Sequence, residues 1–295
     1  MYYKSEIQKG GFLVNKILLL GGDERQKSLA NLFERDNIQV FSAFDDAELE
    51  HLRPISAYET IILPVPCSAD KKHVFSKEKT LSLSLDAVAA AAKNTTRIIG
   101  GGFPDGFCAA AQDNGALLFD LLGERDFALF NAHLTAQGAV RLLLENTKQF
   151  VVSKKALVTG FGKIAKPTAL FLRALGLDVY VAARRKESRT ECAALGFKAL
   201  RIEDLSSCVR IFDFIFNTVP ARLFSKNDVL HMKETAVYFE LASRPYAARE
   251  NDFCSSKARY VFGGGLPGRF CSDSCAEKIK ETIENFFEKR GESIG

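Results

Sequence analysis

The stretch Lys155-Ala-Leu-Val-Thr-Gly160-Phe161-Gly162-Lys163-Ile164-Ala165 decides the predicted fold of the second half of the chain. A short apolar run typical of a buried strand ends in glycine, and a helical segment follows to about residue 175. Gly-x-Gly-x-x-Ala in this context indicates a dinucleotide-binding turn. The first glycine permits a tight turn, the second lets the backbone approach a pyrophosphate, and the alanine lets the helix pack closely on the strand. Helix N–H groups then bind the phosphates. The alternative is a tight strand-to-helix turn that binds no ligand.

The end of the next predicted strand indicates which nucleotide would bind. NAD sites carry an acidic residue about 20 residues after the glycine turn, where it binds the ribose 2′-hydroxyl. Here the strand over residues 178–182 is followed by Ala183-Arg184-Arg185-Lys186, with three cations and no carboxylate. A guanidinium group suits a 2′-phosphate, so NADP is the expected cofactor. The alternative is that these are solvated surface charges.

Further short apolar runs over residues 213–217, 236–240 and 260–262 predict three more strands of the same sheet. In a doubly wound sheet the ligand lies at the carboxyl ends of the strands, so the loops that follow are expected at the site. The residues expected to bind the cofactor from these loops are Asn217, Thr218, Val219, Pro220, Leu241, Ala242, Gly265 and Leu266. The alternative is that their glycines and prolines serve only turn formation.

The first half of the chain opens in a similar way, with Lys16-Ile-Leu-Leu-Leu-Gly21-Gly22-Asp23 before a helical segment to about residue 35. Apolar runs over residues 38–41, 59–64 and 97–100 predict further strands. Alternation of strands and helices predicts a parallel sheet that is covered on both faces. Apolar spacing also predicts long helices over 125–147 and 273–289, which we expect to join the two halves.

The predicted fold class is therefore α/β, with two doubly wound parallel-sheet (Rossmann-like) domains joined by long helices and a cleft between them. The N-terminal substrate-side domain is predicted to comprise residues 1–133 and the C-terminal helix 275–295. The nucleotide-binding domain is predicted to comprise residues 134–274.

Composition excludes several classes of function. The chain has 295 residues, no apolar run as long as the roughly 18–20 residues of a membrane span, and no continuous apolar core of a signal peptide in residues 1–15. Its formal charge of +4 comes from dispersed Lys and Arg, so nucleic-acid binding is not expected. Seven cysteines without zinc-ribbon spacing indicate free thiols in a reducing cytosol and no metal site.

Several segments together resemble a known family, the dipicolinate synthase A subunits of spore-forming bacteria. The segments that carry the resemblance are Gly21-Gly22-Asp23-x-Arg25-Gln26, the helix from Glu124-Arg125-Asp126 to Gly138, the Gly160 turn, Asn217-Thr218-x-Pro220, Leu241-Ala242-Ser243-Arg244-Pro245 and Gly265-Leu266-Pro267-Gly268. The resemblance covers nearly the whole chain from Lys16 onward. One departure is Arg269-Phe-Cys271-Ser-Asp-Ser-Cys275, where the family leads us to expect a proline and a threonine.

The resemblance implies an NADP-dependent oxidoreductase that makes dipicolinate from an intermediate of the lysine pathway during sporulation. It also implies work with a smaller, flavoprotein-like B subunit in the cytoplasm of the mother cell. We further expect a homo-oligomer.

Oxidation of dihydrodipicolinate needs a hydride acceptor, a proton acceptor and groups that hold two carboxylates. Arg244 is the first candidate for the carboxylate clamp and Arg25 the second, since a guanidinium group binds a carboxylate with two hydrogen bonds. Either arginine could instead form a structural ion pair between domains. His133 is the candidate proton acceptor because its ordinary pKa suits a general base, although water, the B subunit or a mere surface role for this histidine are alternatives.

Two other functions stay open. One is another NADP-dependent reductase, of the shikimate or 2-hydroxyacid dehydrogenase type, although no Lys–Asp pair or Arg/Glu/His set that such enzymes need is evident. The other is a non-catalytic NADP-binding subunit that supports its partner.

Overall fold

The computed structural model describes residues 17–77 and 79–292. Residues 1–16, on which the expected absence of a signal peptide rests, lie outside that range. The chain divides into two compact units, one ending at Glu124 and resuming at Ala276, the other comprising Arg125–Cys275. A boundary between residues 133 and 134, as the sequence suggested, would cut through a helix, α5 (Arg125–Glu145).

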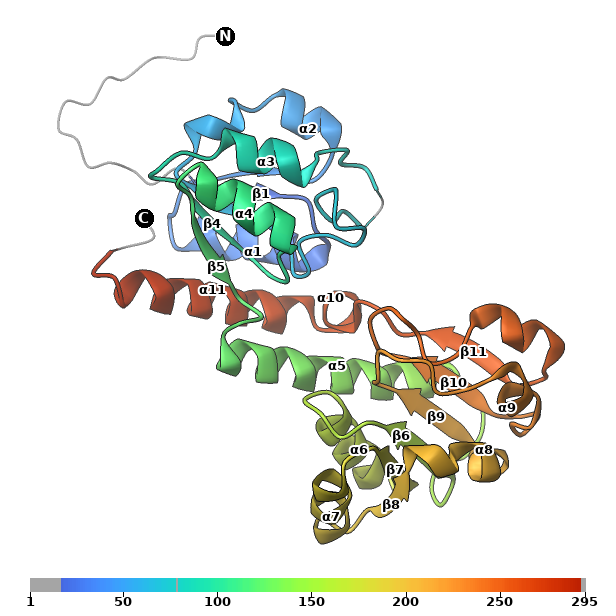
Figure 1. Ribbon diagram of the computed structural model, residues 1–295. Helices are drawn as coiled ribbons and strands as arrows, with labels where there is room; N and C mark the ends of the chain where they lie inside the picture. The colour runs from blue at the N-terminus through green and yellow to red at the C-terminus, as the bar shows by residue number, and fades with distance from the viewer. Residues whose placement is uncertain (1–16, 78, 293–295) are drawn as a thin grey trace, which may run out of the picture. The chain divides into compact units, whose positions relative to one another are not determined.

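The first unit is built on a five-stranded parallel sheet with the order β2-β1-β3-β4-β5 (Figure 1). Its strands are β1 (Ile17–Leu20), β2 (Val40–Ala43), β3 (Thr60–Ile62), β4 (Arg97–Gly100) and β5 (Leu117–Asp120). Its helices are α1 (Glu24–Arg35), α2 (Asp46–Glu50), α3 (Leu85–Ala91), α4 (Asp105–Asp113) and most of α11 (Ser272–Glu288).

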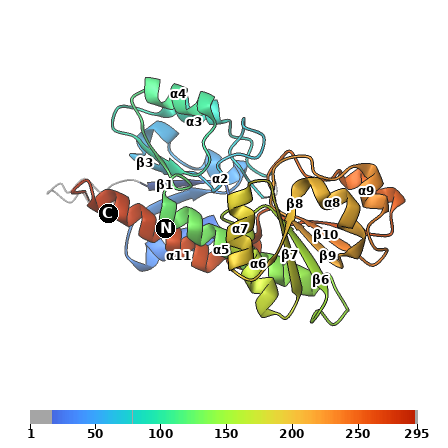
Figure 2. The same ribbon diagram turned by 60° about the horizontal axis from the view of Figure 1, so that its bottom comes forward.

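Helices cover both faces of this sheet because its central strands are apolar on both sides. Every residue of β1 is buried. Leu18 and Leu20 contact the core beneath α3 and α4, in which Val88 and Phe107 take part. On the other face lie α1 and α11 (Figures 1 and 2). This is the burial pattern expected for a parallel sheet between two helical layers.

The second unit carries a six-stranded parallel sheet with the order β11-β10-β9-β6-β7-β8. Its strands are β6 (Lys155–Thr159), β7 (Asp178–Ala183), β8 (Lys198–Arg201), β9 (Phe214–Asn217), β10 (Val237–Glu240) and β11 (Arg259–Phe262). Its helices besides α5 are α6 (Ala165–Ala174), α7 (Lys186–Ala194), α8 (Leu205–Cys208), α9 (Lys226–Leu230) and α10 (Leu266–Phe270).

Two apolar cores lie on either side of the second sheet. On one face α5, α6 and α7 pack against side chains such as Val158 and Phe239. On the other face α8, α9 and the segment around Phe253 pack against Leu157 and Tyr238. The sheet is thereby covered on both faces, as Figure 2 shows. The strand order reverses between β6 and β9, and this reversal is where doubly wound sheets bind ligands.

The predicted fold class of two parallel sheets with flanking helices is confirmed. The predicted strand over residues 97–100 coincides with β4, and the predicted helices over 24–35, 125–147 and 273–289 correspond to α1, α5 and α11. The second strand of the first half lies two residues later than predicted, at Val40–Ala43. The edge strands β5 and β8 were not predicted, although three of the four residues of β5 are apolar; β8 has a lysine and an arginine at its two ends.

Candidate functional site

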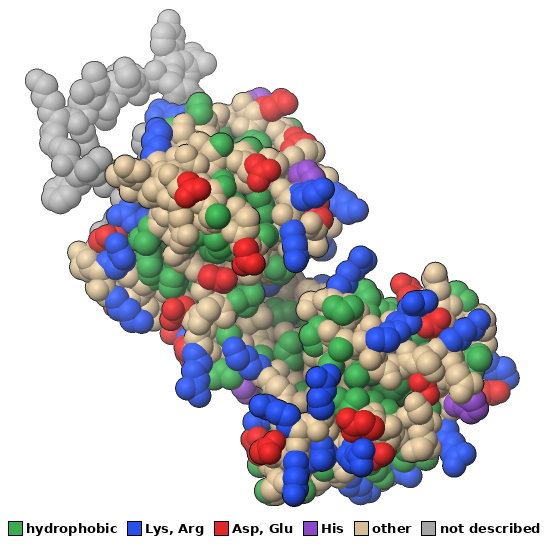
Figure 3. Space-filling model, in the orientation of Figure 1, with side chains coloured by type: hydrophobic (Ala, Val, Ile, Leu, Met, Phe, Trp, Pro, Cys, Tyr) green, Lys and Arg blue, Asp and Glu red, His purple; other side chains and the backbone are tan. Residues whose placement is uncertain are grey.

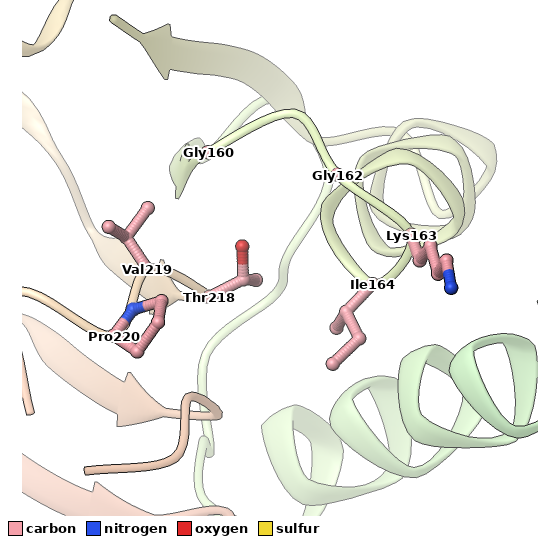
Figure 4. A pocket seen from close by; sticks show the side chains of 7 residues that line it. All are labelled: Gly160, Gly162, Lys163, Ile164, Thr218, Val219 and Pro220. Carbon is pink, nitrogen blue, oxygen red and sulfur yellow. The ribbon is translucent and has the colours of Figure 1, made fainter. Parts of the chain in front are cut away.

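A cavity of about 360 Å³ opens where the strand order of the second sheet reverses. The turn after β6 lines one side with Gly160, Gly162, Lys163 and Ile164. The loop after β9 lines the other side with Thr218, Val219 and Pro220. Figure 4 shows the Thr218 hydroxyl pointing toward the glycine turn and the Ile164 side chain facing the loop across the cavity. The structure thus brings together seven of the residues that the sequence predicted for the cofactor site.

The two glycines of the turn differ in what surrounds them. Gly160 has φ +87°, and a Cβ there would lie 2.9 Å from Thr218 Oγ1. No atom of the described residues lies within 4 Å of a Cβ built on Gly162, so this position faces open space. Gly160 is therefore required by the turn itself, whereas the absence of a side chain at Gly162 leaves the cavity open.

The N-terminus of α6 points its first N–H groups at this turn. Ile164 occupies the N-cap position, and no described side chain caps the helix there. Ala165, the first residue of the helix, is fully buried against the sheet. An uncapped helix N-terminus carries partial positive charge and free N–H donors. Together with the open position at Gly162, it provides the donors and the space that a pyrophosphate needs.

The opposite wall of the cavity is held in place by Asn217, which is itself buried behind the wall. Its Oδ1 accepts from the Val219 N–H at 3.1 Å and from Thr159 Oγ1 at 2.5 Å. Its Nδ2 donates to the Val219 carbonyl at 3.0 Å. The side chain of Asn217, predicted to bind the cofactor, therefore faces the protein interior and fixes the loop that lines the cavity.

Asn217 also donates to the carboxylate of Glu240, at 2.5 Å. Glu240 ends β10 and is fully buried. Burial raises the pKa of its carboxyl group, and hydrogen bonds from Asn217 and Tyr238 oppose that shift. Sequence reasoning missed Glu240. The one signal was a charged residue at the end of an otherwise apolar strand, which is more often a sign of solvent at the strand end.

The tip of β7 carries the cations predicted to select NADP. The side chains of Arg184 and Arg185 are exposed, and no ion pair to a described residue involves either. Arg189 on α7 fixes the backbone beneath them, since its guanidinium donates to the carbonyls of Ala183 at 3.1 Å and of Arg184 at 2.5 Å. Arg189 was also not predicted, although it is the fourth residue of α7, the helix that follows the strand tip.

Five other predicted cofactor residues lie in the apolar core or at a turn. The side chains of Phe161, Leu241 and Leu266 belong to the core beneath α5 and α6. Ala242 is buried, and its N–H donates to Glu240. Gly265 has φ +66° and is the N-cap residue of α10. Side chains in such positions shape the loops around the cavity, and only their backbone could contact a ligand.

The three predicted catalytic residues have different surroundings. Arg244 is exposed on the loop after β10, and its guanidinium lies 5.5 Å from the centre of the Tyr246 ring. Arg25 is buried and forms a bidentate pair with Asp23, with both N–O distances at 2.8 Å. His133 is exposed on α5, and its Nδ1 bonds the Leu129 carbonyl oxygen at 2.8 Å. The Arg25 pair lies within one unit and does not join two domains.

Within the described residues, other surface features indicate no further site. On the face shown in Figure 3, Lys and Arg side chains are interspersed with Asp and Glu and form no continuous basic surface. In residues 17–77 and 79–292 no group of three or more His, Cys, Asp or Glu side chains is arranged to hold a metal ion. No helix within these ranges is long and apolar enough to cross a membrane. All seven cysteines are free thiols.

The fold defines a class, the two-domain proteins in which a domain of Rossmann topology accompanies a second doubly wound domain. Solved structures bear this out. A crystal structure of the dipicolinate synthase A subunit from Bacillus halodurans superposes with a TM-score of 0.80 at 18% identity, over 92% of this chain and 97% of that one. A transhydrogenase from Sinorhizobium meliloti superposes with a TM-score of 0.62 at 15% identity, over 92% and 93%.

Sequence comparison gives matches to one family. Residues 16–122 match the family model that describes the N-terminal domain of the dipicolinate synthase A subunit. The dipicolinate synthase A subunit of Bacillus subtilis is 23% identical over 269 residues, which cover 86% of this chain and 89% of the relative. Both matches are to dipicolinate synthase A subunits, so the resemblance predicted from the sequence is confirmed.

Proposed function

We propose that this chain is the A subunit of an NADP-dependent dipicolinate synthase, which oxidises dihydrodipicolinate to dipicolinate. One observation carries the proposal: an open, uncapped glycine turn lies at the strand reversal of a domain whose β7 tip carries two exposed arginines. The family of the N-terminal domain and the B. subtilis relative support the choice of substrate.

Each part of the nucleotide would meet a different group of residues. N–H groups at the start of α6 and the open position at Gly162 would receive the pyrophosphate. Arg184 and Arg185 would bind the 2′-phosphate, because guanidinium groups pair with phosphate oxygens through two parallel hydrogen bonds. The loop from Thr218 to Pro220 would border the nicotinamide ribose, since it follows the strand on the other side of the reversal.

The oxidation removes one hydride and one proton from the dihydropyridine ring, which becomes aromatic. The hydride acceptor would be supplied by NADP⁺, held by the turn after β6 and the β7 tip. Arg244 would hold a substrate carboxylate, with Arg25 as the second candidate, although the guanidinium of Arg25 already binds Asp23. The proton would go to Nε2 of His133, the ring nitrogen that does not bond the Leu129 carbonyl, or to water.

The relatives are named as A subunits, which supports the existence of a second subunit in the enzyme. We propose that this partner is the flavoprotein-like B subunit. Coexpression should then give a complex that copurifies and forms dipicolinate faster than the isolated chain. Full activity from the isolated chain would contradict the two-subunit proposal. Sedimentation velocity would check the expected homo-oligomer, and the cytoplasm of the mother cell is the proposed location.

The test is a titration of the purified chain with NADPH and NADH. NADPH should bind at least tenfold more tightly, about 1.4 kcal/mol. The double variant Arg184→Ala, Arg185→Ala should lose this preference and bind NADH as before. Equal affinities in the wild type would refute the NADP assignment. Turnover of dihydrodipicolinate with and without the B subunit then separates a catalytic role from one of nucleotide binding only.

A further inference from the structure

A single buried carboxylate connects the two loops that border the nicotinamide end of the proposed site. Glu240 Oε1 accepts hydrogen bonds from Asn217 Nδ2 at 2.5 Å and from the Ala242 N–H at 3.1 Å. Glu240 Oε2 accepts from the Tyr238 hydroxyl at 2.9 Å and from the Ala247 N–H at 3.1 Å. Four donors thus converge on one side chain that is fully buried.

The donors belong to different parts of the site. Through Asn217, Glu240 is linked to Val219, which lines the cavity. The N–H groups of Ala242 and Ala247 lie at the two ends of the loop that carries Arg244. The same carboxylate therefore fixes the wall of the cavity and both ends of the proposed clamp loop.

The chemistry of the donors favours an ionised carboxylate at this position. The Asn217 amide nitrogen and the two backbone N–H groups can only donate, so three of the four partners cannot exchange roles with Glu240. A glutamine has one oxygen, so its NH₂ group would face at least one N–H group that can only donate, whichever way it turned. Among the described residues no cation pairs with Glu240, so its charge is stabilised by neutral donors alone.

A buried charge without a counter-ion lowers the stability of a fold compared with an apolar side chain of similar size. What the Glu240 carboxylate contributes instead is the position of the two loops, because its several lone pairs can accept hydrogen bonds from both loops at once. We infer that Glu240 is a positioning residue, which orders the Thr218–Pro220 wall and the Arg244 loop before the nicotinamide half of the nucleotide binds. This inference rests on the proposed function.

The test compares two ligands that share the adenosine 2′-phosphate. NADPH extends across the whole site, whereas adenosine 2′,5′-bisphosphate ends before the nicotinamide. Glu240→Gln should weaken NADPH at least tenfold, because one loop must then be ordered on binding. It should change the affinity for the bisphosphate less than twofold. Tyr238→Phe is the matched control: it removes one donor from Glu240 but keeps the Asn217, Ala242 and Ala247 hydrogen bonds that hold the two loops, so both ligands should bind as in the wild type.

The outcomes separate this inference from the proposed function. If Glu240→Gln leaves NADPH affinity unchanged, or weakens both ligands equally, Glu240 has a general structural role and the inference is wrong. If that variant does not fold, Glu240→Asp replaces it, since the shorter side chain keeps the charge but cannot reach both loops. If the wild type binds the bisphosphate but not NADPH, the inference fails while the 2′-phosphate site stands. If the wild type binds neither, the proposed function fails and the inference with it.

Discussion

The molecule contains two strand–glycine–helix turns that look alike in sequence and differ in what occupies them. After β1, a Cβ on Gly22 would lie 2.2 Å from Gln26 Cγ, so protein fills that position. Asp23 caps α1, and its carboxylate also binds the Arg25 side chain. After β6, the corresponding space beside Gly162 is open and α6 has no side-chain cap among the described residues.

The difference teaches that glycines after a strand do not by themselves make an anion site. What matters is whether the helix N-terminus already has an anion of its own. The carboxylate of Asp23 takes, at the start of α1, the place that a phosphate is proposed to take at the start of α6. At the start of α1 the chain itself supplies the anion, whereas at the start of α6 a ligand is proposed to supply it.

The largest expected effect comes from breaking the closed turn. Asp23→Ala removes the cap of α1 and leaves the buried Arg25 guanidinium without this carboxylate, so the free energy of unfolding should fall by about 3 kcal/mol. NADPH affinity should not change, because Asp23 belongs to the other turn. Urea unfolding and NADPH titration measure the two quantities.

The control for this variant is Asp45→Ala, which removes a cap without a buried ion pair. Asp45 accepts from the Glu48 N–H at 2.8 Å at the start of α2. Its loss should cost only about 1 kcal/mol. Equal losses for Asp23 and Asp45 would show that the Arg25 pair adds no stability.

The second prediction fills the open turn. Gly162→Ala places a methyl group where no described atom lies within 4 Å, so the free energy of unfolding should stay the same or rise slightly. The methyl group would occupy the approach of the pyrophosphate, and NADPH affinity should fall thirtyfold or more, about 2 kcal/mol. Isothermal titration calorimetry measures this affinity.

Gly106→Ala is the control for Gly162→Ala, because Gly106 on α4 also has open space around its Cβ position. It should leave NADPH affinity unchanged. Wild-type affinity in Gly162→Ala would mean that the turn after β6 is open but binds nothing, and the contrast between the two turns would then be structural only.

The third prediction contrasts the two arginines proposed to clamp the substrate. Arg244 lies exposed on its loop, whereas Arg25 is committed to Asp23. Arg244→Lys keeps the charge but loses the planar fork, so dipicolinate affinity should fall about tenfold while NADPH binds normally. Arg249→Lys, an exposed arginine just after the same loop, is the control and should bind dipicolinate like the wild type. If Arg244→Lys binds dipicolinate as tightly as the wild type, Arg25 becomes the leading clamp candidate.

Sequence alone predicted the sheets and the glycine turn well because their signals are local. Apolar runs that end in glycine mark β1 and β6, and three- to four-residue spacing marks α5 and α11. These patterns depend on neighbours within a few residues, so no tertiary contact is needed to interpret them.

The roles of individual polar side chains were harder to predict because their partners are distant in the chain. Asn217 was expected to face the cofactor since it ends β9, but its amide bonds Glu240, 23 residues away. In contrast, the pairing of Asp23 with Arg25 spans two residues, and an aspartate at a predicted helix start was a signal that could have suggested it. The position of a residue at the end of a strand predicts where the following loop lies, but it does not predict which way the side chain of that residue points.

The smallest expected effect concerns Arg189, which fixes the β7 tip from α7. Its guanidinium donates to the carbonyls of Ala183 and Arg184, so it holds the backbone from which the two proposed 2′-phosphate ligands extend. Arg189→Met keeps much of the length of the side chain but donates no hydrogen bond. The preference for NADPH over NADH should fall about threefold, roughly 0.6 kcal/mol, because Arg184 and Arg185 remain and only their backbone gains freedom.

Arg210→Met, which changes an exposed arginine elsewhere in the same unit, should leave the preference as it is. A fall as large as that of the Arg184, Arg185 double variant would mean that Arg189 itself binds the phosphate, and an unchanged preference would mean that the tip holds its shape without it.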